Sequence, residues 1–231
     1  MITLVSDFDN TFYTLHYLDN ITSIHEFVKE GNYFFLTSER NYVQLISEIK
    51  NFNIPYAFLI CDDGALIYDF YGEKIYHKPL SQEIIKNIFK ELEKTHQFYE
   101  IWYDNGEDYT LDCDGDIYKL IAKPKEYDHI EEYMIKLQEK FPMIRVQMID
   151  NWLHIMDKEI SKASAIRELI KRYELDEKRI YTVGDDLNDL SMIKEFKGFV
   201  MQDGKEEVKK YAIKEVQNMD EIIKYIKEDS K

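Results

Sequence analysis

The chain has 231 residues, enough for one large domain or two small ones, and its 30 Lys and Arg residues stand against 45 Asp and Glu residues. The resulting formal net charge of −15 argues against a nucleic-acid partner. The sequence has only two cysteines and no basic, signal-like N-terminus, which predicts a cytoplasmic protein. It has no apolar run near the ~20 residues of a membrane span, so no membrane partner is expected. A monomer or weak dimer is the default expectation.

The first third of the chain alternates between predicted strands and helices. Strands are expected at residues 2–6, 32–37 and 56–60, and helices at 22–30, with a Thr or Ser cap, and at 42–51. This alternation predicts a parallel sheet with helices on its faces.

The middle of the chain has a different rhythm. Residues 65–69 and 74–77 flank Tyr71-Gly72-Glu73, which predicts a hairpin. Two helices and four strands follow in an antiparallel α+β pattern: helices at 81–94 and 127–140, and strands at 98–103, 117–122, 144–149 and 152–156.

The alternation returns in the last third, with predicted helices at 161–173, 186–195, 206–212 and 219–227 and strands at 179–183 and 198–201. The simplest architecture is an α/β core of residues 1–79 and 159–231. An inserted α+β domain of residues 80–158 interrupts this core.

Polar residues follow three of the predicted core strands. Asp7 and Asp9 come after the first strand, residues 37–40 (TSER) after the second, and residues 184–189 (GDDLND) after the strand at 179–183. Parallel strands place their carboxyl ends at one edge of the sheet, where open α/β folds bind ligands. Several aspartates converging there need a cation, and oxygen ligands favour Mg²⁺ for a phosphate substrate.

A phosphate site in so acidic a protein also needs a local positive charge. Lys162 is the candidate because it starts a predicted helix, whose N-terminus itself favours anions. Each signal has a plain alternative: a D-x-D pair is common in an acidic chain, Ser38 and Asp186 could cap helices, and Lys162 could be solvated. The serial order of the signals, each at a strand end or a helix start, favours a site.

Together these segments resemble the haloacid dehalogenase superfamily, specifically its Cof-type phosphatases with the larger C2B-style cap. DFDNT (residues 7–11) resembles motif I, D-x-D-G-T, and TSER resembles the T-G-R of motif II. SKA (residues 161–163) resembles the lysine motif, and GDDLND resembles motif IV, G-D-x-x-N-D, the most specific of the four. The resemblance implies a Rossmann-like core with a parallel sheet and a C2B-type cap.

The resemblance also implies roles for individual residues. Asp7 would attack phosphorus and form an aspartyl-phosphate, while Asp9 would act as general acid and then general base. The implied metal ligands are Asp7, Asp9 through its backbone carbonyl, Asp185 and Asp189. The implied phosphate-binding residues are Phe8 and Glu39 through their backbone, Ser38, Lys162 and Asn188.

Three positions depart from the family pattern. Asn10 and Glu39 stand where glycine is usual, and Asp63 stands where asparagine is usual. Asparagine tolerates the left-handed conformation that the first position requires. An acid at position 39 could weaken phosphate binding or change substrate preference.

The sequence therefore predicts a Mg²⁺-dependent phosphatase acting on a small phosphorylated metabolite, most simply a sugar phosphate. A phosphosugar mutase or phosphotransferase, or a catalytically weak regulatory protein on the same scaffold, stays open as an alternative. The inserted domain would read the leaving group, and its candidates for sugar contacts are Trp102, Tyr103, Asn151, Trp152 and His154. Packing is the stronger explanation for each of these residues, because aromatic side chains in a small sheet usually serve packing.

Overall fold

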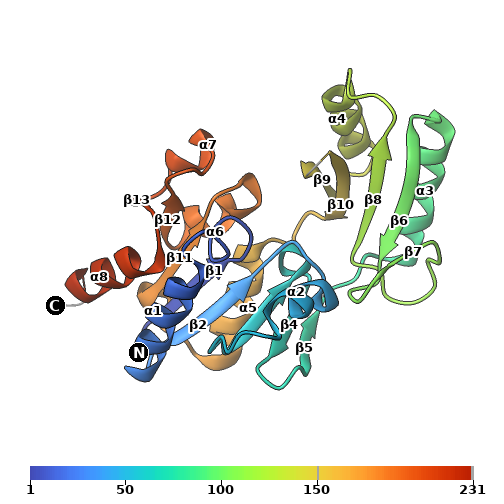
Figure 1. The fold of residues 1–231 in the computed structure, drawn as a ribbon. Helices are drawn as coiled ribbons and strands as arrows, with labels where there is room; N and C mark the ends of the chain where they lie inside the picture. Colours follow the sequence, from blue (N-terminus) through green and yellow to red (C-terminus); the bar gives the residue numbers. More distant parts are fainter. Residues whose placement is uncertain (150, 230–231) are drawn as a thin grey trace.

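The computed structural model describes residues 1–149 and 151–229, which form two β-sheets of unequal size (Figure 1). The large sheet has the strand order β13-β12-β11-β1-β2-β3-β4-β5. Its strands are β1 (Thr3–Asp7), β2 (Tyr33–Thr37), β3 (Phe58–Cys61), β4 (Leu66–Asp69), β5 (Lys74–His77), β11 (Ile180–Gly184), β12 (Lys197–Met201) and β13 (Lys214–Val216).

The centre of the large sheet is parallel, as predicted. β1 lies between β11 and β2, with Ser6 opposite Val183 and Asp7 opposite Thr37. β3, β4 and β5 pair antiparallel, which confirms the predicted hairpin. The carboxyl ends of β1, β2 and β11 therefore meet at one edge of the sheet, at the point where successive connections leave in opposite directions.

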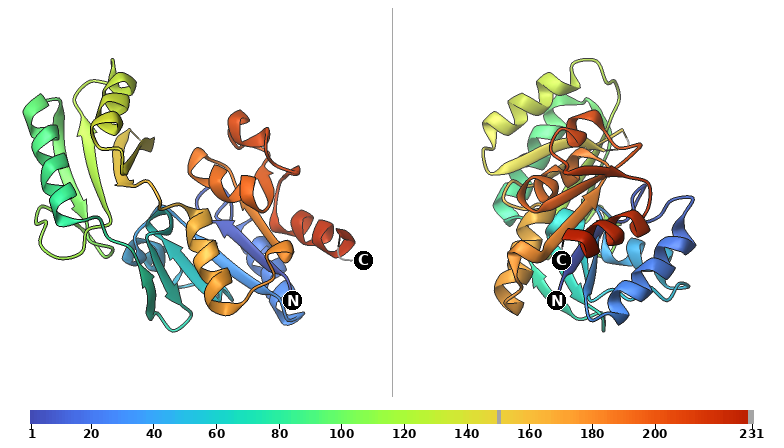
Figure 2. Two further views of the ribbon diagram at one scale, coloured as in Figure 1. Left: turned by 180° about the vertical axis from the view of Figure 1, so that it is seen from behind. Right: turned by 90° about the vertical axis from the view of Figure 1, so that its left-hand side faces the viewer.

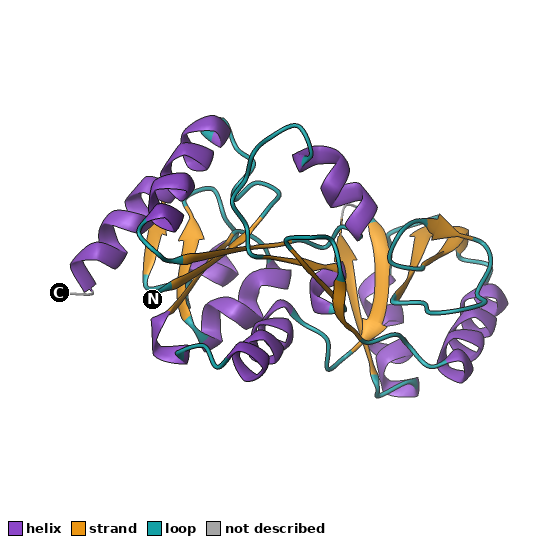
Figure 3. Cartoon of the chain, turned by 90° about the horizontal axis from the view of Figure 1, so that it is seen from below, coloured by secondary structure: helices purple, strands orange, loops and turns teal. Residues whose placement is uncertain are grey.

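Helices cover both faces of the large sheet (Figure 3). Successive residues of β1 point to opposite faces, so Leu4 packs in one apolar cluster and Val5 in the other. The helices on the Leu4 face are α1 (Tyr17–Lys29), α2 (Tyr42–Ile49) and α8 (Met219–Asp229). Those on the Val5 face are α5 (Lys162–Tyr173), α6 (Leu190–Glu195) and α7 (Glu206–Lys209).

The small sheet is antiparallel and stands at one end of the molecule (Figures 1 and 2). Its order is β7-β6-β8-β10-β9, and its strands are β6 (Phe98–Asp104), β7 (Tyr109–Thr110), β8 (Lys119–Pro124), β9 (Ile144–Ile149) and β10 (Trp152–Asp157). Two helices, α3 (Gln82–Thr95) and α4 (Ile130–Lys140), pack on one face through Ile88 and Leu137. The α/β class with a second α+β unit is as predicted, while the domain limits at residues 80 and 158 stay a prediction.

Several predicted boundaries are wrong for identifiable reasons. α1 begins at Tyr17 rather than residue 22, and its N-cap residue is His16, whose side chain makes no capping hydrogen bond. Asn20, inside the first turn, is buried; it donates to the carbonyl of Phe12 and accepts from the N–H of Met219. The predicted helix at 186–195 is a 3₁₀ turn, Leu187–Asp189, followed by α6. The predicted helix at 206–212 ends at Lys209. The strands β7 and β13 have two and three residues, too short for a periodic signal.

Across the described residues, none of the helices combines the length and the apolar character that crossing a membrane would require.

Candidate active site

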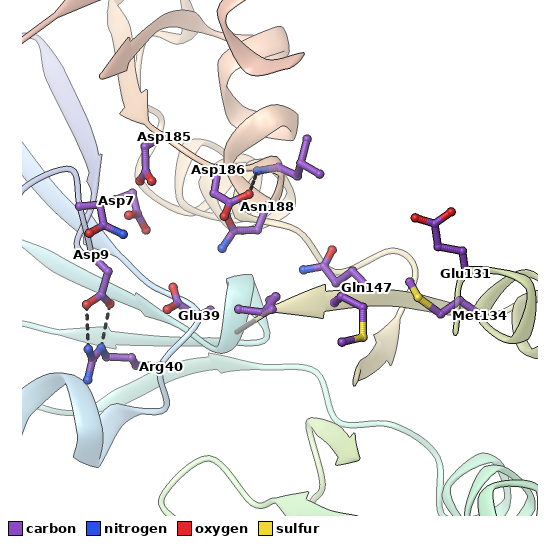
Figure 4. A pocket seen from close by; sticks show the side chains of 14 residues that line it. Asp7, Asp9, Glu39, Arg40, Glu131, Met134, Gln147, Asp185, Asp186 and Asn188 are labelled. Atoms are coloured by element: carbon purple, nitrogen blue, oxygen red, sulfur yellow. Dashed lines mark hydrogen bonds and ion pairs between the residues drawn. The ribbon is translucent and has the colours of Figure 1, made fainter. Parts of the chain in front are cut away.

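Three aspartates from two neighbouring strand ends lie together at the edge of the large sheet (Figure 4 labels Asp7 and Asp185). Asp7 is the last residue of β1, and Asp185 and Asp189 follow β11. Each offers one carboxylate oxygen, and these three atoms lie within 4.8 Å of one another. The parallel pairing of β1 with β11 explains the meeting of residues so far apart in sequence.

The turn after β11 is built around Asp189. Its Oδ2 accepts hydrogen bonds from the N–H groups of Asp185 (2.9 Å) and Asp186 (3.1 Å). A Cβ at Gly184 would lie 2.3 Å from the carboxyl carbon of Asp189, so only glycine fits before this turn. Asp189 thereby fixes the direction in which Asp185 leaves the strand.

Lys162 places one positive charge behind these aspartates. It is completely buried at the first position of α5, where Ser161 caps the helix through the N–H of Ser164. Its Nζ donates to Asp7 Oδ1 (2.5 Å) and Asp189 Oδ1 (2.6 Å). Burial alone lowers the pKa of Lys162, but the charges of Asp189 and Asp7 outweigh it and raise that pKa well above its usual value. The lysine is therefore a fixed cation.

One lysine does not balance three aspartates. Burial, and then repulsion by Asp189, raise the pKa of Asp185 to about 7, against the opposing hydrogen bond from Thr11 (2.8 Å). Burial likewise raises the pKa of Asp7 well above its usual value, with Lys162 opposing. A compact, oxygen-only donor set that is short of positive charge fits a hard divalent cation such as Mg²⁺.

Asp9 faces away from the other aspartates, towards Arg40 (Figure 4). The guanidinium donates from Nε to Asp9 Oδ2 (2.8 Å) and from Nη2 to Oδ1 (2.7 Å), a two-bond contact. The hydrogen bond to Asp9 raises the pKa of Arg40 above its usual value. Arg40 was not predicted as a site residue, and the available signal was its position at the end of the TSER segment, two residues after the hydroxyl residue Ser38.

The loop after β2 is held by bonds to its neighbours. Ser38 is fully buried, and its Oγ accepts from the N–H of Arg40 (3.1 Å). Ser38 does not cap α2, because Asn41 does so through the N–H of Gln44. The carbonyl of Glu39 accepts a hydrogen bond from the buried Lys119 of β8 (2.6 Å).

Two of the three positions that depart from the family pattern, Asn10 and Asp63, have left-handed backbone conformations. Asn10 has a φ of 55°, the left-handed conformation expected for a position where glycine is usual. Asp63 also has a positive φ, 53°, and its Oδ1 accepts from the side chain of Asn188 (3.1 Å).

A cavity of about 400 Å³ lies between this edge and the small sheet. The core lines it with most of the predicted site: Asp7, Asp9, Glu39, Asp185 and Asn188, together with Arg40 and the stretch Asp186–Leu187. Phe8, Ser38, Lys162 and Asp189 are buried and are not among the residues that line this cavity. The small domain contributes residues that no pattern in a single chain could mark: Glu131 and Met134 of α4, and Gln147, Met148 and Ile149 of β9.

The predicted sugar-contact candidates separate into two groups. Trp102, Trp152 and His154 line an adjoining cavity of about 780 Å³, which shares Glu39, Arg40 and Ile149 with the first. Burial lowers the pKa of His154 to about 3, so its imidazole is neutral. Tyr103 instead packs against Phe89 in the interior of the small domain, and Asn151 is an exposed residue between β9 and β10.

Known proteins are similar to this chain along most of its length. The family model for haloacid dehalogenase-like hydrolases matches residues 4–113 and 107–226. A protein of Buchnera aphidicola subsp. Baizongia pistaciae, provisionally named a phosphatase, is 26% identical over 222 residues, 82% of each chain. A phosphoglycolate phosphatase of Staphylothermus marinus is 26% identical over 184 residues, 78% of this chain and 74% of its own.

Solved structures show the same fold at low sequence identity. A haloacid dehalogenase-like hydrolase of B. subtilis has a TM-score of 0.83 at 18% identity, covering 98% of this chain and 99% of its own. A sugar phosphatase of haloacid dehalogenase subclass IIB has a TM-score of 0.80 at 17% identity, covering 100% of this chain and 99% of its own.

Proposed function

The chain belongs to the haloacid dehalogenase-like hydrolases, and from this premise we propose that it is a Mg²⁺-dependent phosphatase of small phosphorylated metabolites, most simply of a sugar phosphate. The observation that carries the proposal is the Asp7 carboxylate, which lines the cavity while bonded to the fixed cation Lys162. A carboxylate held in this position is preorganised to attack the phosphorus atom of a bound ester.

In the proposed reaction, an oxygen of Asp7 forms a bond to phosphorus as the ester P–O bond breaks, and the alcohol oxygen leaves with the bonding electron pair. A proton from Asp9 then neutralises that alcohol oxygen. In the second half, a water oxygen attacks phosphorus, the Asp7 O–P bond breaks, and the water proton passes to Asp9. Asp9 must therefore turn one oxygen from Arg40 towards the leaving group.

The phosphoryl oxygens need donors that stay in place. We propose Lys162, Ser38, Asn188 and the backbone N–H groups of Phe8 and Glu39. Each preorganised donor in sites of this kind is worth about 2.7–4 kcal/mol of transition-state stabilisation. Asp7 and Asp185, with Asp189 beside them, would hold Mg²⁺, and the backbone carbonyl of Asp9 is the further proposed ligand. When bound, the ion offsets the repulsion between the Asp7 carboxylate and a phosphate dianion.

Hydrolysis fits this cavity better than transfer between two phosphate positions. A mutase must also hold a phosphate at the far end of its substrate, which requires cations there. Among the described residues that line the cavity, Arg40 is the single cation, and it is paired with Asp9. This charge pattern supports the phosphatase.

The test is phosphate release from p-nitrophenyl phosphate and a panel of sugar phosphates, with Mg²⁺ and with EDTA. We expect release with Mg²⁺ and its loss with EDTA. Equal release in both conditions would reject the metal requirement, and no release from any ester by folded protein would reject the phosphatase.

A further inference from the structure

We propose that Glu39 makes this site selective for phosphate esters whose alcohol part carries a protonated amine. This inference rests on the proposed phosphatase function and narrows its substrate class. It starts from a residue that departs from the family pattern, since a glycine at position 39 would bring no charge into the cavity.

Glu39 is placed firmly at the cavity wall. Figure 4 shows its side chain at the cavity between Asp7 and Arg40, where it lines both cavities described above. A hydrogen bond from Lys119 to the carbonyl of Glu39 (2.6 Å) holds its backbone in place. Lys119 is itself completely buried and paired with Asp62 (2.7 Å). The backbone that carries the Glu39 carboxylate is thus anchored from the small sheet.

Three of the other acidic groups of the cavity have ion-pair partners. Asp9 is paired with Arg40 (2.7 Å), Asp186 with Lys205 (2.6 Å), and Asp7 with Lys162 (2.5 Å), while Asp185 belongs to the proposed metal site. Across the described residues, Glu39 and Glu131 are the lining carboxylates without an ion pair or an assigned metal role.

Two unpaired carboxylates in the cavity lining would make the site prefer substrates whose alcohol part is positively charged. Glu39 rises from the core loop after β2 and Glu131 from α4, so the two carboxylates line the cavity from opposite domains (Figure 4). Burial raises the pKa of Glu39; the charge of Lys162 opposes this shift, and repulsion from Asp63 and Asp9 adds to it. A neighbouring ammonium on the substrate would offset that repulsion. A carboxylate or second phosphate on the substrate would instead add to it.

The experiment compares three six-carbon 6-phosphate esters whose alcohol parts carry a positive charge, no charge and a negative charge: glucosamine 6-phosphate, glucose 6-phosphate and the open-chain 6-phosphogluconate. With Mg²⁺ at pH 7, we expect kcat/KM to fall in that order, by about tenfold for each step of charge. Raising the NaCl concentration should compress these ratios, because screening weakens the attraction.

Two isosteric variants assign the effect. Glu39→Gln should lower the amine-to-neutral ratio of kcat/KM, with Glu131 keeping the remainder, and should raise the relative rate with 6-phosphogluconate. Glu207→Gln removes one charge from an exposed position of α7 outside the cavity lining and should leave both ratios unchanged. If Glu39→Gln does not fold, the salt dependence of the wild-type ratios carries the test.

The outcomes separate this inference from the proposed function. Hydrolysis of all three esters with equal kcat/KM, or best with 6-phosphogluconate, overturns the inference and leaves the phosphatase in place. An unchanged ratio in folded Glu39→Gln overturns the role of Glu39. No hydrolysis of these esters or of p-nitrophenyl phosphate overturns the proposed function and this inference together.

Discussion

At the scale of single residues, the contact between Arg40 and Asp9 decides where the proposed proton carrier sits. Two bonds of 2.8 and 2.7 Å hold the carboxylate in one orientation at the cavity wall. Arginine makes this two-pronged contact and lysine cannot. The contact therefore holds the Asp9 carboxylate at the cavity wall, clear of the other aspartates, in the position from which one oxygen turns towards the leaving group.

Arg40→Lys keeps the charge and loses the two-bond geometry. We expect kcat for p-nitrophenyl phosphate to fall by about tenfold to a hundredfold, the range seen when a reacting group is misplaced by about 1 Å. Arg172→Lys, which alters an exposed ion pair with Glu168 on α5, is the matched control and should keep wild-type kcat. Full activity in Arg40→Lys would show that Asp9 does not depend on this contact.

Asp185 links the site to stability. Its folded-state pKa of about 7 lies above the ordinary value of 3.8, so the unfolded chain releases this proton first as pH rises. Its contribution to stability is thus complete below pH 3.8 and lost as pH rises through about 7. Without metal at pH 8, the wild type carries an unfavourable ionised carboxylate at this position.

In EDTA at pH 8, Asp185→Asn should therefore raise the melting temperature by about 2–4 °C, roughly 1 kcal/mol for a chain of this size, and by little at pH 4. Mg²⁺ should raise the melting temperature of the wild type and not of the variant. Asp186→Asn, one residue further, is the control and should give no such gain, because Asp186 is paired with Lys205. A less stable Asp185→Asn at pH 8 in EDTA would contradict the charge balance given above.

The site residues themselves could be predicted from the sequence, but the partners of their side chains could not. The aspartates could be predicted because they lie at strand ends, and Lys162 because it lies at a helix start. The partners could not: Asp9 meets Arg40 across 31 residues, and Lys119 meets Glu39 across 80. Such contacts depend on the packing of elements, which a single sequence does not encode as a local pattern.

At the scale of elements, the start of α5 positions the buried cation. Ser161 accepts from the N–H of Ser164, and the hydroxyl of Ser164 accepts from the N–H of Ser161, so the first turn is closed from both sides. Lys162 is the next residue, so the cap fixes the position of its backbone. Loss of the cap should therefore affect both stability and turnover.

Ser161→Ala should cost about 1 kcal/mol of unfolding free energy, the usual value of an N-cap, and should also lower kcat. Ser81→Ala is the matched control, since Ser81 caps α3 in the small domain through the N–H of Ile84. It should cost a similar free energy while kcat stays at the wild-type value. Equal kcat in the two variants would separate the α5 cap from the placement of Lys162.

Predicted elements were right where the apolar period is long and the ends carry turn residues. The parallel strands β1, β2 and β11 and the helix α5 belong to this group. The predicted start of α1 at residue 22 was wrong: the helix begins at Tyr17, and Asn20 in its first turn is bonded to Met219, far away in sequence. Long-range hydrogen bonds of this kind override local helix signals.

At the scale of the whole molecule, a buried charge cluster joins the small domain to the core. Lys119 of β8 reaches Asp62 (2.7 Å), Asp104 (3.5 Å) and the carbonyl of Glu39 (2.6 Å), and all three charged side chains are almost fully buried. Asp62 and Glu39 belong to core loops, whereas Asp104 ends β6. The cluster therefore ties the position of the small sheet to the loop that lines the cavity.

Lys119→Met would leave two carboxylates buried without their cation, which costs about 3–5 kcal/mol in comparable pairs. We expect a large loss of stability in chemical denaturation, partly recovered by adding Asp62→Asn. Lys136→Met removes an exposed lysine paired with Glu132 and should change stability by no more than about 0.5 kcal/mol. Wild-type stability in Lys119→Met would contradict this role of the cluster.

The most direct test of the central claim is to trap the bond between Asp7 and phosphorus. A single turnover with Mg²⁺ is quenched in acid, reduced with borohydride and analysed by peptide mass spectrometry. We predict that residue 7 is converted to homoserine, the reduction product of an aspartyl-phosphate, and that Asp7→Asn gives neither this product nor phosphate release. Phosphate release with an unmodified residue 7, or modification at another aspartate, would contradict the account.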